Sequence, residues 1–360
     1  MRILFICLGW LLSILFCFAQ ESKLTKWYHP IEAAFPVIAG QGWNAPEIGD
    51  YHRLPQRAEV DVRTPLWNLS KHAAGLSIHF KTNASELKVK YKLKNAIAMP
   101  HMPATGVSGV DLYGKSYNGD WLRYWGSYKI EENALFTYPL DSTSEWYQLY
   151  LPLYNEIDSL YLGIAEGFDF SFLPVNSTKP IVAYGTSICQ GACASRPGMA
   201  WTNILERQLE RPVINLGFSG NGRLEPELID LVNEIDAAVV ILDCLPNLST
   251  RRDDVFQLVI AAVKKIRVEQ PKVPIVLTEH PGYSNEATNK DKEIEVQALN
   301  AELQKAYQQL IFDEVESLYI LTKDVLNLQP DHFVDHIHPS DLGMRQYAIA
   351  YSELIRSILD

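Results

Sequence analysis

The spacing of apolar and polar positions divides the chain into three parts. Residues 3–18 form an apolar run that carries no charge. From residue 20 to residue 177 apolar side chains tend to fall on every second position, most clearly at 74–80 and 86–91, which is typical of half-buried strands. The remainder changes to short, wholly apolar stretches separated by segments of helical periodicity. We therefore expect a removable N-terminal segment, a β domain and an α/β domain.

The second part, residues 20–177, is predicted to be an antiparallel, jelly-roll-like β-sandwich. Turn-forming residues such as Asn83 and the Asn-Gly pair at 118–119 separate its alternating stretches, and no long helical period interrupts them. A polar stretch at 176–178, just ahead of Pro180, marks the expected domain boundary.

The third part, residues 178–360, is predicted to be an α/β domain. Strands that are apolar on both faces and alternate with helices are typical of a parallel sheet covered by helices on both sides. The expected strands are 181–184, 213–216, 237–242, 273–277 and 318–321, and the longest expected helices are 253–269, 293–311 and 340–359.

The first part has the features of a secretory signal peptide. Arg2 supplies the positive start, and Cys17-Phe18-Ala19 ends the apolar run with a small–x–small spacing. We expect cleavage after Ala19, and hence a secreted or periplasmic protein with no stable membrane association. An uncleaved membrane anchor is the alternative.

Composition narrows the functional classes. The 360 residues carry a formal net charge of −11, with 47% hydrophobic and 21% charged residues, which is ordinary for a globular protein and unfavourable for binding nucleic acid. Six of the eight tryptophans fall in residues 20–177, where they fill the sandwich core or stack on sugar rings. Three cysteines follow the expected cleavage site and permit at most one internal disulfide: Cys189, Cys193 and Cys244.

Polar residues suited to acyl transfer follow the predicted strands at their carboxyl ends, where open α/β sheets bind ligands. Ser187 comes soon after strand 181–184, at the position of a nucleophile or of a helix cap. Asp335 precedes His338 by three residues, ahead of the last helix. His338 can accept the serine proton while Asp335 orients its imidazole, so these residues predict a Ser-His-Asp triad.

The oxyanion formed in acyl transfer needs hydrogen-bond donors. The segments after the second and third strands offer the backbone N–H of Gly217 or Gly220 and the side-chain amide of Asn247. The N–H of Ser187 is a third donor. The residues alone do not decide between the two glycines.

These four segments, in this order, resemble the four blocks of the SGNH, or GDSL-type, hydrolases. Gly-Thr-Ser-Ile at 185–188, Gly-Phe-Ser at 217–219, Asn247 and Asp-x-x-His at 335–338 carry the resemblance. It implies a flavodoxin-like three-layer domain. The roles that it implies are those of a catalytic triad, Ser187, Asp335 and His338, and of an oxyanion hole, Ser187, Gly217 and Asn247.

The chain departs from the commonest wording of the blocks in two places. It has Gly-Thr-Ser for Gly-Asp-Ser, and Pro-Asn-Leu at 246–248 where many members have Gly-x-Asn-Asp. Neither change removes a catalytic group, but the second leaves the shape of the loop at Asn247 open.

The β half resembles the N-terminal domain of a bacterial subgroup of the same family, marked by a Gly-x-Asp-Leu-Tyr motif. The motif stands here as Gly-Val-Asp-Leu-Tyr at 109–113, and the segment 191–198 also resembles that subgroup. The resemblance implies an esterase, often an acetyl esterase, that acts on an acylated carbohydrate or another small ester. We expect no cofactor. The candidate substrate-binding residues are Asp111, His101, Arg196 and His280, with a fold-supporting role as the alternative for the first two.

Other classes stand as alternatives to a secreted serine esterase. Histidines and acids crowd at 332–338, and Cys189 and Cys193 are four apart, but the Cys-x-x-Cys and His-Glu-x-x-His patterns of zinc sites do not accompany them, so we expect no catalytic metal. A non-catalytic carbohydrate-binding protein would keep the tryptophans without needing Ser187, Asn247 and His338 together. A lipase or thioesterase would use the same triad.

Overall fold

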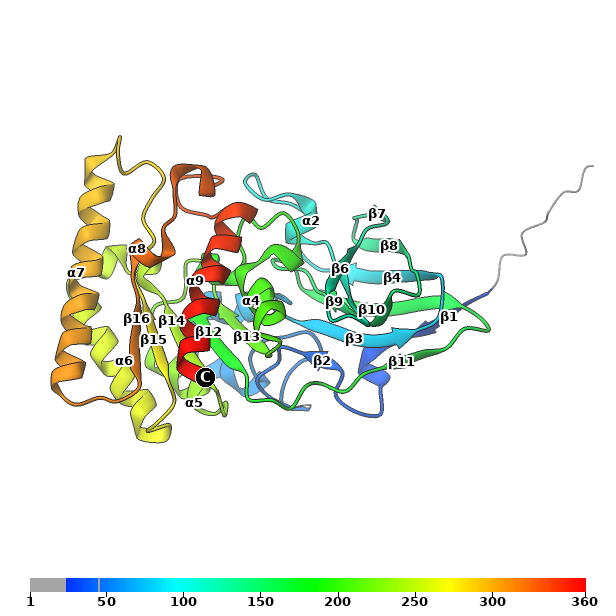
Figure 1. Cartoon of the computed structure of the whole chain (residues 1–360), viewed down its shortest axis with the longest axis horizontal. Coiled ribbons are helices and arrows are strands. Elements are labelled where there is room, and N and C mark those ends of the chain that lie inside the picture. The colour runs from blue at the N-terminus through cyan, green and yellow to red at the C-terminus, as the bar shows by residue number, and fades with distance from the viewer. Residues whose placement is uncertain (1–23, 45) are drawn as a thin grey trace, which may run out of the picture.

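The computed structural model describes residues 24–44 and 46–360. The expected signal peptide 1–19, with its cleavage after Ala19, lies outside these residues. Within them, no helix combines the length and the apolar character needed to cross a membrane. The β-rich part and the helix-covered sheet follow one another along the long axis of the molecule (Figure 1).

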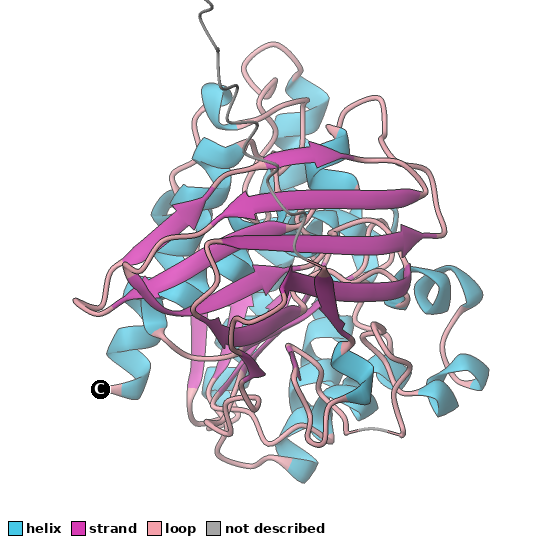
Figure 2. Cartoon of the chain, turned by 90° about the vertical axis from the view of Figure 1, so that its right-hand side faces the viewer, coloured by secondary structure: helices cyan, strands magenta, loops and turns pink. Residues whose placement is uncertain are grey.

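The N-terminal part is a sandwich of two antiparallel sheets (Figure 2). Alternate side chains, such as Leu87 and Val89 of one sheet and Ile78 and Phe80 of the other, meet in one buried cluster, as the period-two pattern predicts. The first sheet runs in the order β1 (Thr25–Tyr28), β10 (Ile157–Ala165), β4 (Glu86–Leu93), β8 (Asn133–Pro139) and β7 (Ser127–Lys129). The second runs in the order β11 (Phe170–Phe172), β3 (Ser77–Thr82), β9 (Ser144–Tyr150), β5 (Asp111–Ser116) and β6 (Trp121–Tyr124), and β2 (Ile38–Ala39) also pairs with β3.

The C-terminal part is built on a five-stranded parallel sheet, which confirms the predicted α/β class. Its strand order, with the second strand outside the first, is that of flavodoxin-like folds. The strands lie in the order β13 (Val213–Gly217), β12 (Ile181–Gly185), β14 (Val239–Asp243), β15 (Ile275–Thr278) and β16 (Leu318–Leu321).

Helices cover both faces of this sheet because its strands are apolar on both sides. Within β12, Ile181 and Ala183 pack into one helical layer, whereas Val182 and Tyr184 pack into the other. The first layer contains α3 (Ser187–Gln190), α4 (Trp201–Leu209), α8 (Lys323–Leu326) and α9 (Asp341–Leu359), and the second contains α5 (Pro226–Asn233), α6 (Val255–Glu269) and α7 (Lys290–Phe312).

A segment from the β half completes the core of the α/β part. Residues 43–67, which include the start of α1 (Thr64–Ser70), precede most of the sandwich in sequence. Their apolar side chains nevertheless belong to the cluster formed by the sheet and helices α5 and α6, with Leu54, Leu66 and Trp67 each no more than 3% exposed. The two parts therefore share a core, although the chain passes from one to the other near residue 177.

Candidate active site

Ser187 lies at the carboxyl edge of the parallel sheet, where β12 turns directly into α3. The Thr186 hydroxyl caps this helix by accepting from the Ile188 N–H at 3.3 Å. The turn is tight at Gly185, since a Cβ there would lie 2.7 Å from the Cβ of Cys189. As the first residue of the helix, Ser187 has no helical acceptor for its own N–H.

His338 joins Ser187 to Asp335. The Oγ of Ser187 lies 3.0 Å from Nε2 of His338, and Nδ1 of His338 lies 2.8 Å from Oδ2 of Asp335. The other carboxylate oxygen accepts from the backbone N–H groups of Ile337 and His338 at 2.8 and 2.7 Å. The structure thus brings together all three residues of the predicted triad, from segments about 150 positions apart.

These hydrogen bonds keep the Asp335 carboxylate ionised. Burial by itself would raise the pKa of Asp335, but the donors from the His338 ring and the two backbone N–H groups outweigh it and lower the pKa to about 2. The charged carboxylate accepts from Nδ1–H, which leaves the Nε2 lone pair of His338 facing the serine hydroxyl.

In the loop that follows β13, Gly220 is a better candidate than Gly217 for a backbone donor to the oxyanion. The N–H of Gly217 already donates to Oδ1 of Asn215 at 2.9 Å, and a Cβ on Gly217 would lie 2.2 Å from the backbone nitrogen of Gln190. Gly217 is therefore a close-packing position, and this geometry argues against the oxyanion-hole role that the family resemblance implies for it. Gly220 has a φ of 69°, a Cβ added to it would meet nothing within 4 Å, and its N–H meets no acceptor within residues 24–44 and 46–360.

Asn247 lies at the end of a short 3-10 turn after β14. Its Oδ1 accepts from the Gly222 N–H at 3.2 Å, which directs the Nδ2 donor away from that loop. The Ser219 N–H donates to Oε1 of Gln190 in α3 at 3.0 Å, so the 219–222 loop is fastened on both sides. The N–H groups of Ser187 and Gly220 and the side-chain amide of Asn247 are therefore the candidate donors to the oxyanion.

Arg53 is a positioning residue that the sequence patterns did not indicate. Its side chain is only 1% exposed and lies under the end of β13, where it donates to the carbonyls of Asn215 and Gly217 at 3.1 and 2.7 Å. Two further donors reach the carbonyls of His72 and Leu69. Burial lowers its pKa to about 10, so the guanidinium stays charged and is held by carbonyl oxygens instead of a carboxylate.

Two of the four candidate substrate-binding residues support loops. Asp111 is 2% exposed and accepts from Arg196 and from the Gly198 N–H, so it fastens the 191–198 loop to β5. His280 is fully buried, and burial lowers its pKa to about 3. It makes no hydrogen bond or ring contact with a triad residue, and it packs on Tyr283 instead.

The other two candidates lie closer to the surface of the site. The exposed His101 stacks its ring on that of His338, with the ring centroids 5.5 Å apart. Arg196 joins Asp111 to the hydroxyl of Tyr113 and lines a small cavity of about 190 Å³. Thr105 donates to the Ser195 carbonyl at the rim of the same cavity.

The three described cysteines are buried free thiols with no disulfide among them. Burial, together with the charge of Asp335, raises the pKa of Cys193 to about 12, so its thiol is protonated at neutral pH. Cys193 therefore lacks the thiolate of a cysteine nucleophile. The side chains close enough to hold a metal ion within residues 24–44 and 46–360 are those of His101, Cys193 and His338, so of the histidines crowded at 332–338 only His338 takes part.

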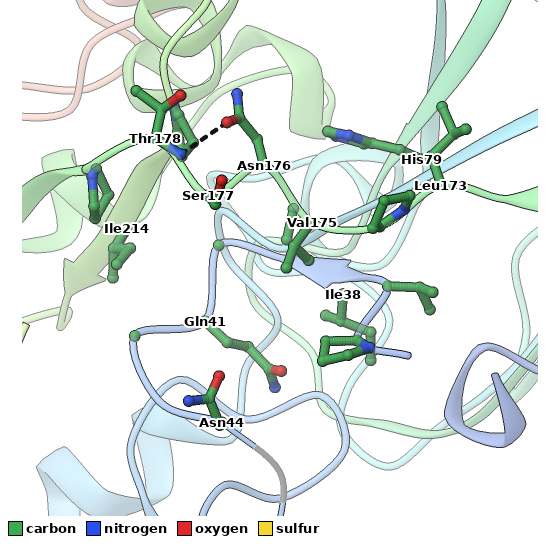
Figure 3. Close-up of a pocket in the computed structure, with 18 of the residues that line it drawn as sticks. Ile38, Gln41, Asn44, His79, Leu173, Val175, Asn176, Ser177, Thr178 and Ile214 are labelled. Atoms are coloured by element: carbon green, nitrogen blue, oxygen red, sulfur yellow. Dashed lines mark hydrogen bonds between the residues drawn. The ribbon is translucent and has the colours of Figure 1, made fainter. Parts of the chain in front are cut away.

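A cavity of about 990 Å³ lies away from the triad, between the sandwich and the amino edge of the parallel sheet (Figure 3). Its lining includes Pro180 and Pro212, which precede β12 and β13, and the aromatic residues His79, Trp121 and Trp146. Because catalytic groups of such sheets lie at the carboxyl edge, the hydrogen-bonded residues and not the cavity volume locate the candidate active site.

A parallel sheet with a serine, a histidine and an aspartate hydrogen-bonded at its carboxyl edge is the arrangement of a serine hydrolase. Two family models match the two halves: residues 178–356 match the GDSL-like lipase/acylhydrolase family, and residues 25–170 match the GxDLY domain, the N-terminus of SGNH-hydrolase-type esterases. The chain belongs to this family of ester hydrolases, which confirms the resemblance seen in the sequence.

Solved structures share the whole architecture. A GDSL-like lipase from Bacteroides ovatus is 29% identical over 93% of this chain and 98% of its own, with a TM-score of 0.85. A salicylyl-acyltransferase from a tetracycline biosynthetic pathway is 17% identical over 93% and 97%, with a TM-score of 0.72. An acetyl xylan esterase from the rumen bacterium Butyrivibrio proteoclasticus shares the fold at 10% identity over 93% and 99%, with a TM-score of 0.53. A comparison with curated proteins gives no match.

Proposed function

We propose that the protein is a serine esterase that uses Ser187, His338 and Asp335 as its catalytic triad. The observation that carries this proposal is the unbroken chain of hydrogen bonds from Ser187 Oγ through both ring nitrogens of His338 to the ionised Asp335. A general base needs a hydrogen bond to the nucleophile through one ring nitrogen and to an orienting carboxylate through the other, whereas a structural histidine needs neither.

In the proposed reaction, Nε2 of His338 takes the hydroxyl proton as Ser187 Oγ attacks the ester carbonyl. The oxyanion is held by the donors of Ser187, Gly220 and Asn247. His338 then gives the proton to the leaving alcohol, which leaves an acyl-serine. A water molecule, deprotonated by the same nitrogen, releases the acid and restores Ser187.

Replacing Ser187 by Ala tests the mechanism. Turnover of 4-nitrophenyl acetate by the full chain should fall by about a thousandfold or more, because the nucleophile is lost while the fold is kept. Ser171→Ala, at the exposed position of strand β11, is the matched control and should retain full activity. Unchanged turnover in Ser187→Ala, with an unchanged thermal unfolding curve, would refute the proposal.

For the substrate we propose an acetylated carbohydrate. An exposed aromatic face supports this class: Trp125 is 66% exposed and lines the small cavity beside the 191–198 loop. That loop is tied to the catalytic segment, because Ser195 donates through its N–H and its hydroxyl to Asp341, three residues after His338. Aromatic faces stack on sugar rings, and the occurrence of the same fold in carbohydrate esterases agrees with this choice.

Acetate release from acetylated xylan and other acetylated polysaccharides tests the substrate class. Trp125→Ala should lower the rate on the preferred polysaccharide by about fivefold, since a stacked aromatic is worth roughly 1 kcal/mol, and should leave 4-nitrophenyl acetate turnover unchanged. Tyr117→Ala, an equally exposed aromatic outside the cavity, is the control. If no polysaccharide releases acetate, turnover of long-chain esters would point to a lipase, and turnover of thioesters would point to a thioesterase.

A further inference from the structure

Three side chains, one of them that of the proposed general base His338, form a group of possible metal ligands beside the nucleophile. His101 comes from the sandwich, Cys193 from the loop after α3, and His338 from the segment before α9. Each offers one ligand atom, and these atoms all lie within 4.8 Å of one another. We propose that these residues form an inhibitory binding site for a zinc-like divalent cation. The inference rests on the proposed function only for its activity readout.

The donor set selects the class of cation. Two imidazole nitrogens and a thiolate sulfur suit Zn²⁺ and other borderline-soft ions, whereas Mg²⁺ and Ca²⁺ prefer oxygen ligands. Zinc–ligand distances of about 2.0–2.3 Å place tetrahedral ligands roughly 3.5 Å apart. The group therefore has to close by about 1 Å, and His101 can move to do so because it is exposed.

His338 already has the second hydrogen bond that is typical of a metal-ligating histidine. A ligating histidine commonly donates its second ring N–H to a carboxylate, which fixes the tautomer and raises the basicity of the ligating nitrogen. Asp335 accepts from Nδ1 of His338 at 2.8 Å, so Nε2 presents its lone pair on the side of Ser187. The same lone pair serves the proposed general base, so a cation bound there removes the base.

The other two ligands are held close to His338 by the fold. The ring of His101 stacks on His338, and the Cys193 thiol lies 3.3 Å from the carbonyl oxygen of His101. Cys193 has a φ of 66°, a conformation that a tight turn imposes and that fixes the direction of its Cβ. On binding, the Cys193 thiol transfers its proton to solvent and its sulfur forms the metal–thiolate bond.

The bound cation has room for a fourth ligand. Ser187 Oγ lies 3.0 Å from Nε2 of His338, which makes the serine hydroxyl, or a water molecule, the natural fourth ligand. Coordination therefore occupies both the base and the nucleophile. We expect reversible inhibition that is competitive with the ester, without unfolding of the protein.

Zinc titration of the full chain tests the inference by two readouts: 4-nitrophenyl acetate turnover and isothermal titration calorimetry. Micromolar ZnCl₂ should inhibit, EDTA should restore activity, and MgCl₂ should have no effect. Cys193→Ser and His101→Asn each lack one ligand, so both should bind zinc more weakly. We expect the calorimetric Kd to rise by at least tenfold in each variant. The zinc concentration that halves the variant's own uninhibited rate should rise by the same factor.

The control is Cys244→Ser, which alters a buried thiol outside the ligand group and should keep the wild-type response to zinc. His101→Asn lies at an exposed position, so the test stands even if Cys193→Ser does not fold. The proposed site would be overturned if both ligand variants showed the same zinc inhibition and the same Kd as the wild type. It would also be overturned if calorimetry detected no zinc binding. A protein that binds zinc through Cys193 but hydrolyses no ester would overturn the proposed function and leave the metal site standing.

Discussion

At the scale of single residues, Asn247 uses its two polar atoms differently. The oxygen is engaged by the Gly222 N–H, so the amide Nδ2 remains as a donor for the oxyanion. Removing one such donor costs about a hundredfold to a thousandfold in kcat, because it acts on charge that develops in the transition state. We expect this loss in Asn247→Ala on 4-nitrophenyl acetate, with KM changed far less.

The control for Asn247→Ala is Asn133→Ala, at an exposed position of β8 in the sandwich. Thermal unfolding should report any loss of the Gly222 contact separately from kinetics. A kcat for Asn247→Ala within threefold of the wild type would exclude the amide from the oxyanion hole.

The role of a residue could be predicted where neighbouring residues in the sequence indicate it, and not where it depends on packing between distant segments. Ser187, Asp335 and His338 stand at strand and helix ends with a recognisable spacing, and the structure brings them within hydrogen-bond distance. Arg53 lies in an ordinary polar stretch, and its importance comes from carbonyls 162 and 164 positions away. The engagement of the Gly217 N–H by a neighbouring side chain likewise has no signature in a short motif.

At the scale of elements, wholly apolar stretches located the parallel strands well. The predicted strand 318–321 coincides with β16, and helix 340–359 differs from α9 by one residue at its start. The four-residue helices α2 (Ala104–Val107), α3 and α8 were not predicted, because they are too short to show a helical period.

The contact between α4 and β9 contains a titratable group. Glu206 of α4 accepts from the hydroxyl of Tyr150 at 2.8 Å and from Nε2 of Gln148 at 3.0 Å, both on β9. Burial raises the pKa of Glu206 to about 7, against the lowering effect of these hydrogen bonds and of Arg207. Below about pH 7 the folded state therefore favours the protonated carboxyl.

The direction of the pH effect follows from this raised pKa. The unfolded carboxyl titrates near 4.3, so between about pH 4.3 and 7 the folded state binds more protons and the free energy of unfolding falls as pH rises. The contribution is fully present below pH 4.3 and fully lost above about pH 7. In Glu206→Gln this decline should be absent, so urea unfolding at pH 4.5 to 8.5 should give a flatter profile than the wild type.

The control for Glu206→Gln is Glu210→Gln, directly after the same helix but exposed. Its unfolding free energy should follow the wild-type pH profile. Parallel profiles for the wild type and Glu206→Gln would show that Glu206 titrates in the folded protein as it does in the unfolded chain.

At the scale of the whole molecule, the two parts depend on each other. Local pattern placed the transition near residue 177 and indicated the architecture of each part, but it assigned residues 43–67 to the sandwich alone. Periodicity describes which face of an element is buried and not which element covers it. The element that covers a buried face is set by contacts between residues far apart in the sequence. Trp43 is an example, since its ring N–H donates to Glu234 of the α/β part at 2.7 Å.

The shared core predicts that residues 178–360 do not fold stably alone. Their separation removes Leu54, Leu66 and Trp67 from the sheet–helix cluster, and each large buried side chain is worth about 2–5 kcal/mol. The carbonyls of Asn215 and Gly217 also lose Arg53. The summed loss is comparable with the whole stability of a domain, about 5–15 kcal/mol.

We therefore expect the 178–360 fragment to bind a hydrophobic dye such as ANS and to melt without a cooperative transition, whereas residues 24–360 unfold cooperatively. The decisive comparison is a third form, in which residues 41–70 are joined through a flexible linker to the start of the fragment. If the missing core is the cause, this form should regain a cooperative transition that the fragment lacks. A fragment that unfolds cooperatively near the midpoint of the longer chain would show instead that the sheet and its helices suffice, and that residues 43–67 only cover a core that is already stable.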